Sequence, residues 1–237
     1  MTTRLLAPLV ALVVLSAAPL AQFKSGTLSV PLYVTVTDRE GRLVPHLERE
    51  DFEVYDNGQL QKLTLFDNQT TPITVVVMLD TSGSMTLILD RVKDAAEQFL
   101  IRLLPEDMGR VGAFNDKIEF HPEEAFTSDR DLLVRSLKEL DFGYPTRLWD
   151  AVDESIRRLD GVDGRKVVLV FTDGADTASR RDLDDVMHEA RAKEIMVYAI
   201  GLETEIFNGQ RRQRSSPDRG LKKLAEETGG GFFLLKK

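Results

Sequence analysis

The chain has 237 residues, of which 30% are charged and 42% hydrophobic, and its formal net charge is -8. This composition is typical of a globular protein and excludes a disordered chain, while the length allows one sizeable core with a small appendage. The acidic balance argues against general nucleic-acid binding. The absence of cysteine excludes disulfide bonds and a lipid-modified N-terminal cysteine.

Residues 1–21 have the pattern of a secretory signal peptide. Arg4 supplies a positive start, residues 5–20 are nearly all apolar, and Ala21 is a plausible cleavage point, although Pro19 is atypical at that distance before it. An uncleaved anchor is the alternative, but a run of about 16 residues is shorter than the about 20 that cross a bilayer. We therefore expect an exported bacterial protein, periplasmic or extracellular, without a stable membrane span after signal removal.

Residues 27–70 have a β-rich pattern. Residues 32–37 alternate between apolar and polar, and the runs 52–55 and 63–66 flank Asp56-Asn57-Gly58, in which Asn-Gly is a strong hairpin signal. About 40 residues are too few to bury a core alone. The segment must therefore pack on the rest of the chain, pair with another chain, or complete a sandwich whose other strands are missing.

From Ile73 onward, apolar runs typical of strands alternate with amphipathic helical patterns. This alternation predicts an α/β fold: a doubly wound, mostly parallel sheet with helices on both faces. The runs 111–114 and 118–120 are close enough in sequence to form an antiparallel pair. The other predicted strands are 73–79, 166–172, 195–200 and 232–235, and the predicted helices are 87–103, 132–140, 148–159, 183–193 and 221–228.

Oxygen-bearing side chains follow two of the predicted buried strands and stand on a turn between them. In an open α/β sheet, ligands bind at the carboxyl ends of the strands. Carboxylates and hydroxyls without any His or Cys suit Mg²⁺ or Mn²⁺ rather than zinc. The residues are Asp80, Ser82 and Ser84 after the strand 73–79, Thr146 on the turn, and Asp173 after the strand 166–172.

These segments resemble the metal-ion-dependent adhesion site (MIDAS) of the von Willebrand factor type A (vWA) family. The family motif is Asp-x-Ser-x-Ser, a Thr on a second loop and an Asp after another strand, and this chain fills all five positions. The resemblance covers residues 72–237, and residues 27–70 are similar to the β-rich segment that precedes the vWA domain in a group of exported bacterial proteins. In the family a helix normally follows the last strand. Because the sequence reaches Lys237 directly after that strand, we expect a vWA domain lacking its final helix.

The resemblance implies a metal-dependent protein-binding module that serves adhesion or assembly. In such sites Mg²⁺ or Mn²⁺ keeps an open coordination position, which a Glu or Asp of the partner fills. The loop 202–220 is expected to be mobile and solvated. Its basic residues Arg211, Arg212 and Arg214 are a possible patch for an acidic partner.

Other interpretations of the site remain open. Asp80 and Asp173 could cap the helices that follow them, or the domain could be structural, with no metal-mediated ligand. A Mg²⁺-dependent hydrolase is a further alternative, but haloacid-dehalogenase-like phosphatases need a second Asp where this chain has Ser82. The three histidines lie outside the site motifs, and none accompanies a nucleophile elbow. We therefore predict that the protein is not an enzyme.

Overall fold

The computed structural model describes residues 30, 32–68, 71–141, 143–207 and 212–235. Residues 31–237 cluster as one unit and residues 1–30 as another. The predicted signal peptide at 1–21 lies outside the described residues, as does Arg211 of the basic run. No helix within the described ranges is long and apolar enough to cross a membrane.

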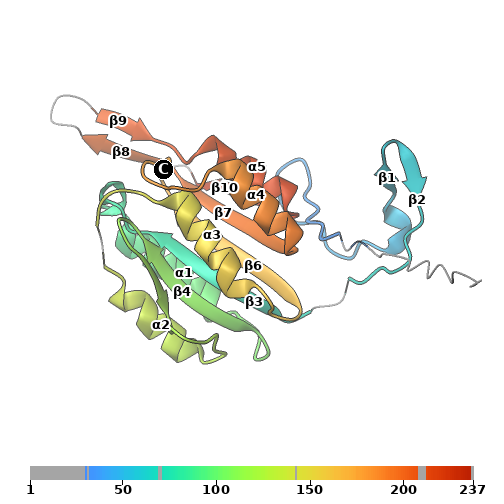
Figure 1. Ribbon diagram of the computed structural model, residues 1–237, viewed down its shortest axis with the longest axis horizontal. Coiled ribbons are helices and arrows are strands. Elements are labelled where there is room, and N and C mark those ends of the chain that lie inside the picture. The colour runs from blue at the N-terminus through green and yellow to red at the C-terminus, as the bar shows by residue number, and fades with distance from the viewer. Residues whose placement is uncertain (1–29, 31, 69–70, 142, 208–211, 236–237) are drawn as a thin grey trace, which may run out of the picture. The chain divides into compact units, whose positions relative to one another are not determined.

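A six-stranded sheet with the order β10-β7-β6-β3-β4-β5 forms the centre of the fold (Figure 1). All neighbouring strands run parallel except β4 and β5, which form the predicted antiparallel pair. The run Val75-Val76-Val77 in β3 is fully buried because a parallel sheet is covered on both faces. The strands are β3 (Ile73–Asp80), β4 (Met108–Phe114), β5 (Ile118–His121), β6 (Arg165–Thr172), β7 (Ile195–Leu202) and β10 (Phe232–Leu235).

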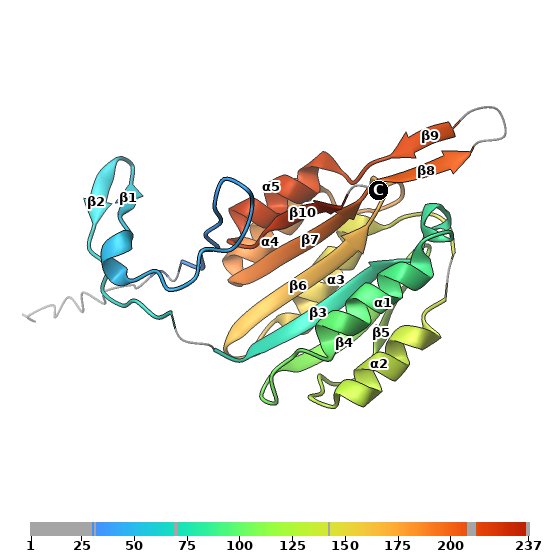
Figure 2. The same cartoon turned by 180° about the vertical axis from the view of Figure 1, so that it is seen from behind.

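Helices cover both faces of the sheet, as Figures 1 and 2 show. On one face, Val76 and Met78 of β3 share a core with α3 (Leu148–Leu159), α4 (Leu183–Ala192) and α5 (Arg219–Glu227). On the other face, Val75, Val77 and Leu79 share a core with α1 (Leu89–Leu100) and α2 (Arg130–Glu139). The alternation of strand residues between two cores confirms the predicted α/β fold with helices on both faces.

The N-terminal hairpin is confirmed, but it is shorter than predicted. β1 (Val54–Asp56) and β2 (Gln59–Gln61) pair antiparallel across Asn57 and Gly58, both of which have positive φ, as a tight hairpin turn requires. The predicted strand 52–55 was wrong in extent, and the predicted strand 63–66 was wrong, because the second strand is formed by residues 59–61 directly after the turn. Phe52 and Phe66 instead pack ring against ring, with centroids 5.4 Å apart, and the short 3-10 helix η1 (Arg49–Asp51) precedes the hairpin.

Residues 32–37 do not form the strand that their alternation predicts, apart from an isolated bridge between Thr37 and Leu43. This segment packs on the larger sheet through side chains. The hydroxyls of Thr35 and Tyr198 are 2.8 Å apart, and Thr35 also donates to the carbonyl of Gly229 at 3.0 Å. Of the three possibilities for the β-rich segment, packing on the rest of the chain therefore holds for residues 33–35.

The segment predicted as a loop at 202–220 contains a second hairpin, so the prediction of a loop without secondary structure was wrong. β8 (Thr204–Phe207) pairs antiparallel with β9 (Arg212–Ser215). The hairpin leaves the carboxyl end of β7, and β8 lies against the 3-10 turn η2 (Gly83–Met85) (Figures 1 and 2). Backbone pairing within this loop explains why it does not remain an open loop.

Gly229 offers a test of how the segment 32–37 is held. Its φ is +76°, and a Cβ built there would lie 2.0 Å from the carbonyl oxygen of Tyr33. We expect Gly229→Ala to lower the free energy of unfolding by about 1–3 kcal/mol, since backbone strain adds to a clash. The variant should also expose residues 32–37 to protease. Urea denaturation and limited proteolysis measure the two effects.

Gly164→Ala is the matched control, because Gly164 also has positive φ, +84°, but nothing lies within 4 Å of its built Cβ. This control should show the strain alone, without release of the N-terminal segment. Equal protease sensitivity in the two variants would mean that the contact with Tyr33 does not hold the segment.

Candidate metal centre

Three loops meet at the carboxyl edge of the sheet. The first follows β3 and includes η2, the second precedes α3, and the third follows β6. Because β3 and β6 are parallel neighbours, Asp80 and Asp173 leave the sheet at the same edge. The second loop lies beside the first, since the N–H of Gly143 donates to the carbonyl of Thr81 at 3.0 Å and Gly143 bridges to Ser82.

Hydrogen bonds join the predicted site residues of the first and third loops into one chain. The backbone N–H of Ser82 donates to Asp80 Oδ1 at 2.9 Å. The hydroxyl oxygens of Ser82 and Ser84 are 3.1 Å apart, and Ser84 donates to Asp173 Oδ1 at 2.7 Å. The structure therefore brings these four predicted residues together, although the two carboxylates are 93 positions apart in the sequence.

Thr146, the fifth predicted residue, is buried on the second loop and is hydrogen-bonded to the third loop. Its N–H donates to the Thr177 hydroxyl at 3.1 Å, and its carbonyl accepts from the N–H groups of Thr177 and Ala178 at 3.0 and 3.1 Å. These contacts use the backbone of Thr146. Its position is thus fixed by main-chain bonds that do not depend on its own side chain.

Asp80 is fully buried, and its surroundings disfavour its charge. Burial raises the pKa of this carboxyl to about 6, and the charge of Asp173 adds to the effect. The hydrogen bond from Ser82, together with one from the Thr172 hydroxyl at 2.6 Å, acts in the opposite direction and lowers the pKa. These donors are neutral, so a cation beside the two buried carboxylates would be stabilised.

The residues fit a small divalent cation. Neighbouring oxygen ligands of an octahedral Mg²⁺, each about 2.0–2.1 Å from the ion, are about 2.9 Å apart. Ser82 Oγ and Ser84 Oγ are 3.1 Å apart, and Ser84 Oγ and Asp173 Oδ1 are 2.7 Å apart. These are hydrogen-bond distances, and they are close enough to that spacing for the three oxygens to contact one ion. In the described part of the chain no three His, Cys, Asp or Glu side chains gather as a metal cluster, so a centre here depends on the hydroxyls as well.

Asp150, which sequence reasoning missed, connects the second and third loops from the first turn of α3. Its Oδ1 accepts from the N–H groups of Arg180 and Arg181, both at 3.0 Å, and its Oδ2 accepts from Arg147 Nε at 3.1 Å. Burial alone would raise the pKa of Asp150, but the N–H groups and the Arg147 guanidinium outweigh it and the pKa is lowered. Asp150 therefore stays ionised and anchors the segment that follows Asp173.

Part of the predicted basic patch lies near this edge. Arg212 and Arg214 are on β9, at the register positions opposite Phe207 and Glu205. Since β8 lies against η2, the hairpin that carries them adjoins the first loop. Their role as a partner-binding patch stays a prediction.

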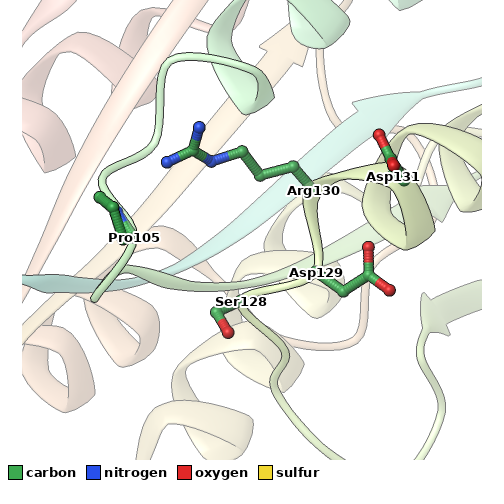
Figure 3. A pocket seen from close by; sticks show the side chains of 5 residues that line it. All are labelled: Pro105, Ser128, Asp129, Arg130 and Asp131. Carbon is green, nitrogen blue, oxygen red and sulfur yellow. The ribbon is translucent and has the colours of Figure 1, made fainter.

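A shallow hollow of about 390 Å³ lies elsewhere, between Pro105 and residues 128–131 at the start of α2 (Figure 3). Asp129 in its wall already caps α2 by accepting from the Leu132 N–H at 2.9 Å. Pro105 precedes β4 and therefore lies toward the amino end of that strand, away from Asp80. The hollow contains none of the predicted site residues.

Comparison with solved structures shows the same fold in several proteins. One is an aerotolerance-related membrane protein from Bacteroides fragilis NCTC 9343 carrying multiple mutations to serine (TM-score 0.58, 16% identity, covering 69% of this chain and 91% of that chain). A second is a von Willebrand factor type A protein from Catenulispora acidiphila (TM-score 0.60, 17% identity, covering 70% of this chain and 39% of that chain). A third is proximal thread matrix protein 1 from the mussel byssus with a zinc-occupied MIDAS motif (TM-score 0.55, 14% identity, covering 69% of this chain and 41% of that chain).

A search of curated proteins finds no match. The family model of the von Willebrand factor type A domain, however, matches residues 74–237, which include all of β3 except Ile73 and all five predicted site residues. The match covers more than half of the sequence and agrees with the sheet order and the three-loop site. The chain therefore belongs to the von Willebrand factor type A domain family.

Proposed function

We propose that the protein binds Mg²⁺ or Mn²⁺ at Asp80, Ser82, Ser84, Thr146 and Asp173, and through the cation binds a Glu or Asp of a protein partner. The observation that carries this proposal is the continuous contact from Asp80 through the two serines to Asp173 at the sheet edge. Adhesion and assembly are the two settings that such a module would serve.

The mixture of ligand types supports carboxylate capture. Three of the five proposed ligands are neutral hydroxyls, and Asp80 and Asp173 are the two carboxylates. When bound, the cation supplies positive charge that this ligand set neutralises only in part, which favours an additional anionic oxygen. A partner carboxylate is such a group, and electrostatic complementarity would give the encounter its specificity.

The nature of the metal follows from the donor set. Hydroxyl and carboxylate oxygens favour Mg²⁺ and Mn²⁺, whereas zinc more often takes nitrogen and sulfur ligands. A related fold nevertheless holds zinc in its MIDAS motif. Calorimetric titrations with Mg²⁺, Mn²⁺ and Zn²⁺ should therefore be run in parallel to compare the affinities of the site for the three ions.

A binding module accounts for the site better than a hydrolase. The residue two positions after Asp80 is Ser82, whose hydroxyl contacts Ser84 and supplies no second carboxylate for phosphoryl transfer. His121 lies on β5 and His188 on α4, outside the three loops of the site. We therefore propose that the protein is not an enzyme.

Asp80→Asn tests the metal centre. Asparagine keeps an oxygen that can accept from the Ser82 N–H but removes a buried charge. Because burial raises the pKa of Asp80 from 3.8 to about 6, ionisation at pH 7 opposes folding. Without metal, the variant should be more stable than the wild type by about 1–3 kcal/mol at pH 7. This advantage should shrink as the pH falls from about 6 and vanish below about 4, where Asp80 is protonated in both states.

Added Mg²⁺ should reverse the order of stability. It should raise the denaturation midpoint of the wild type by mass action and leave the variant unchanged. Thermal denaturation in EDTA and in Mg²⁺, with calorimetry of the ion alone, measures both effects. Equal Mg²⁺ binding by the wild type and the variant would remove Asp80 from the site.

Thr146→Ala separates partner binding from folding. Alanine keeps the backbone bonds to Thr177 and Ala178, so the free energy of unfolding should change by less than about 1 kcal/mol. Loss of the hydroxyl should weaken Mg²⁺-dependent binding of an acidic peptide about 10-fold or more, the range typical for metal-site residues. The probes are peptides selected in Mg²⁺ from a displayed library with one fixed Glu, each remade with Gln as its own control.

Thr64→Ala provides a matched threonine control at an exposed position of the N-terminal segment. Full binding by Thr146→Ala would show that this hydroxyl does not act at the metal. Unfolding of the variant would show instead that Thr146 has a structural role.

We also propose that the protein is exported and that its first 21 residues are removed. The support is the charge of Arg4 and the apolar run at 5–20. Expression of the full sequence in a bacterial host, followed by fractionation and mass spectrometry, should give a mature protein that begins close to Gln22. An intact Met1 in the cytoplasmic fraction would contradict export.

A further inference from the structure

Tyr144 lies directly on the backbone of the first loop. A Cβ built on Gly83, the residue between Ser82 and Ser84, would be 1.8 Å from Tyr144 Cε1 and 2.4 Å from its hydroxyl oxygen. The aromatic ring therefore occupies the space that any side chain at position 83 would need. Despite this contact, Tyr144 is 69% exposed, so the ring presents a wide apolar surface to solvent beside the two serines.

Leu87 lies two residues after the 3-10 turn η2, which begins at Gly83. It is 86% exposed, the highest value among the large hydrophobic side chains that the structure describes. The turn before it is well fixed, because the Thr86 hydroxyl donates to the Gly83 carbonyl at 2.9 Å and the Ile88 N–H donates to the Met85 carbonyl at 2.9 Å. Leu87 is thus held outward by an ordered backbone.

Both exposed side chains belong to the loops that carry the proposed ligands. Tyr144 is two residues before Thr146, and Leu87 is three residues after Ser84. Tyr is enriched among the residues that dominate the binding energy of protein interfaces. An exposed leucine adds apolar area that a partner can bury. Such side chains also exclude water from a central charged contact, which strengthens it.

We propose that Tyr144 and Leu87 form an apolar rim that selects a partner whose acidic residue is flanked by apolar side chains. The partner's carboxylate would meet the metal centre, and its apolar neighbours would bury the ring of Tyr144 and the side chain of Leu87. This inference rests on the proposed function, because the rim acts next to the carboxylate contact. The rim would determine which partner residues are accepted on either side of the carboxylate, namely apolar ones.

A series of small carboxylates separates the two contacts. The probes are acetate, 4-methylpentanoate and 3-phenylpropanoate, with succinate as a probe for additional negative charge. Each is titrated by NMR into the full chain in Mg²⁺ and again in EDTA. If the rim takes part, 4-methylpentanoate and 3-phenylpropanoate should bind about 10-fold more tightly than acetate in Mg²⁺, a gain that corresponds to burying one or two methylene groups.

Tyr144→Ser and Leu87→Ser should each reduce that preference about 3-fold or more, while acetate and Mg²⁺ bind as in the wild type. Tyr144→Phe should keep the preference, because the ring remains. Tyr55→Ser and Leu65→Ser are the matched controls, since Tyr55 is 57% and Leu65 82% exposed in the N-terminal segment. Neither control should change the binding of any probe.

The outcomes distinguish the rim from the metal centre. Absence of Mg²⁺-dependent binding for every carboxylate would overturn the proposed function and the rim with it. Mg²⁺-dependent binding of acetate without an apolar preference, or a preference unchanged in Tyr144→Ser and Leu87→Ser, would overturn the rim alone. A preference for succinate over the apolar acids would also overturn it and would favour the arginine-bearing hairpin β8–β9 as the neighbouring contact.

Discussion

The parallel pairing of β3 with β6 is the constraint on which the site depends. It brings Asp80 and Asp173 to one edge of the sheet, where both carboxylates are fully buried. A buried carboxylate destabilises the fold unless donors or a cation compensate its charge. The Ser82 N–H and the Thr172 hydroxyl offset part of this cost. The remaining cost is what the proposed cation would offset.

The second and third loops are joined to each other without any ligand. The backbone of Thr146 forms hydrogen bonds with Thr177. The carboxylate of Asp150 accepts hydrogen bonds from the N–H groups of Arg180 and Arg181. These bonds fix the positions of the proposed ligands in advance, which reduces the entropy lost on binding. The Thr146 hydroxyl can therefore be removed while the backbone of the second loop stays in place.

Periodicity and strand ends were sufficient to predict the sheet and its helices, because these depend on local patterns. The grouping of Asp80, Ser82, Ser84 and Asp173 at one edge agrees with the predicted motif, but their role as metal ligands stays a prediction. The helix 148–159 agrees with the structure at both ends. The hairpin β8–β9 was missed, although Asn208-Gly209 in the sequence is the same turn signal that located β1 and β2. Asp150 and Thr172 were missed for another reason. Their partners are distant in sequence, and an Asp in the first turn of a helix has a sufficient local explanation.

Residues 32–37 show why alternation alone cannot establish a strand. Tyr33 and Thr35 face the larger sheet, while Leu32 and Val34 remain 59% and 63% exposed, so the alternation is real but its contacts are made by side chains rather than by a ladder. The Arg165 guanidinium, at the beginning of β6, lies 5.8 Å from the centroid of the Tyr33 ring. The segment thus meets the sheet near the amino ends of its strands, whereas the proposed metal ligands lie at the carboxyl edge. Side-chain contacts of this kind form no ladder, so the sequence pattern alone could not distinguish them from a strand.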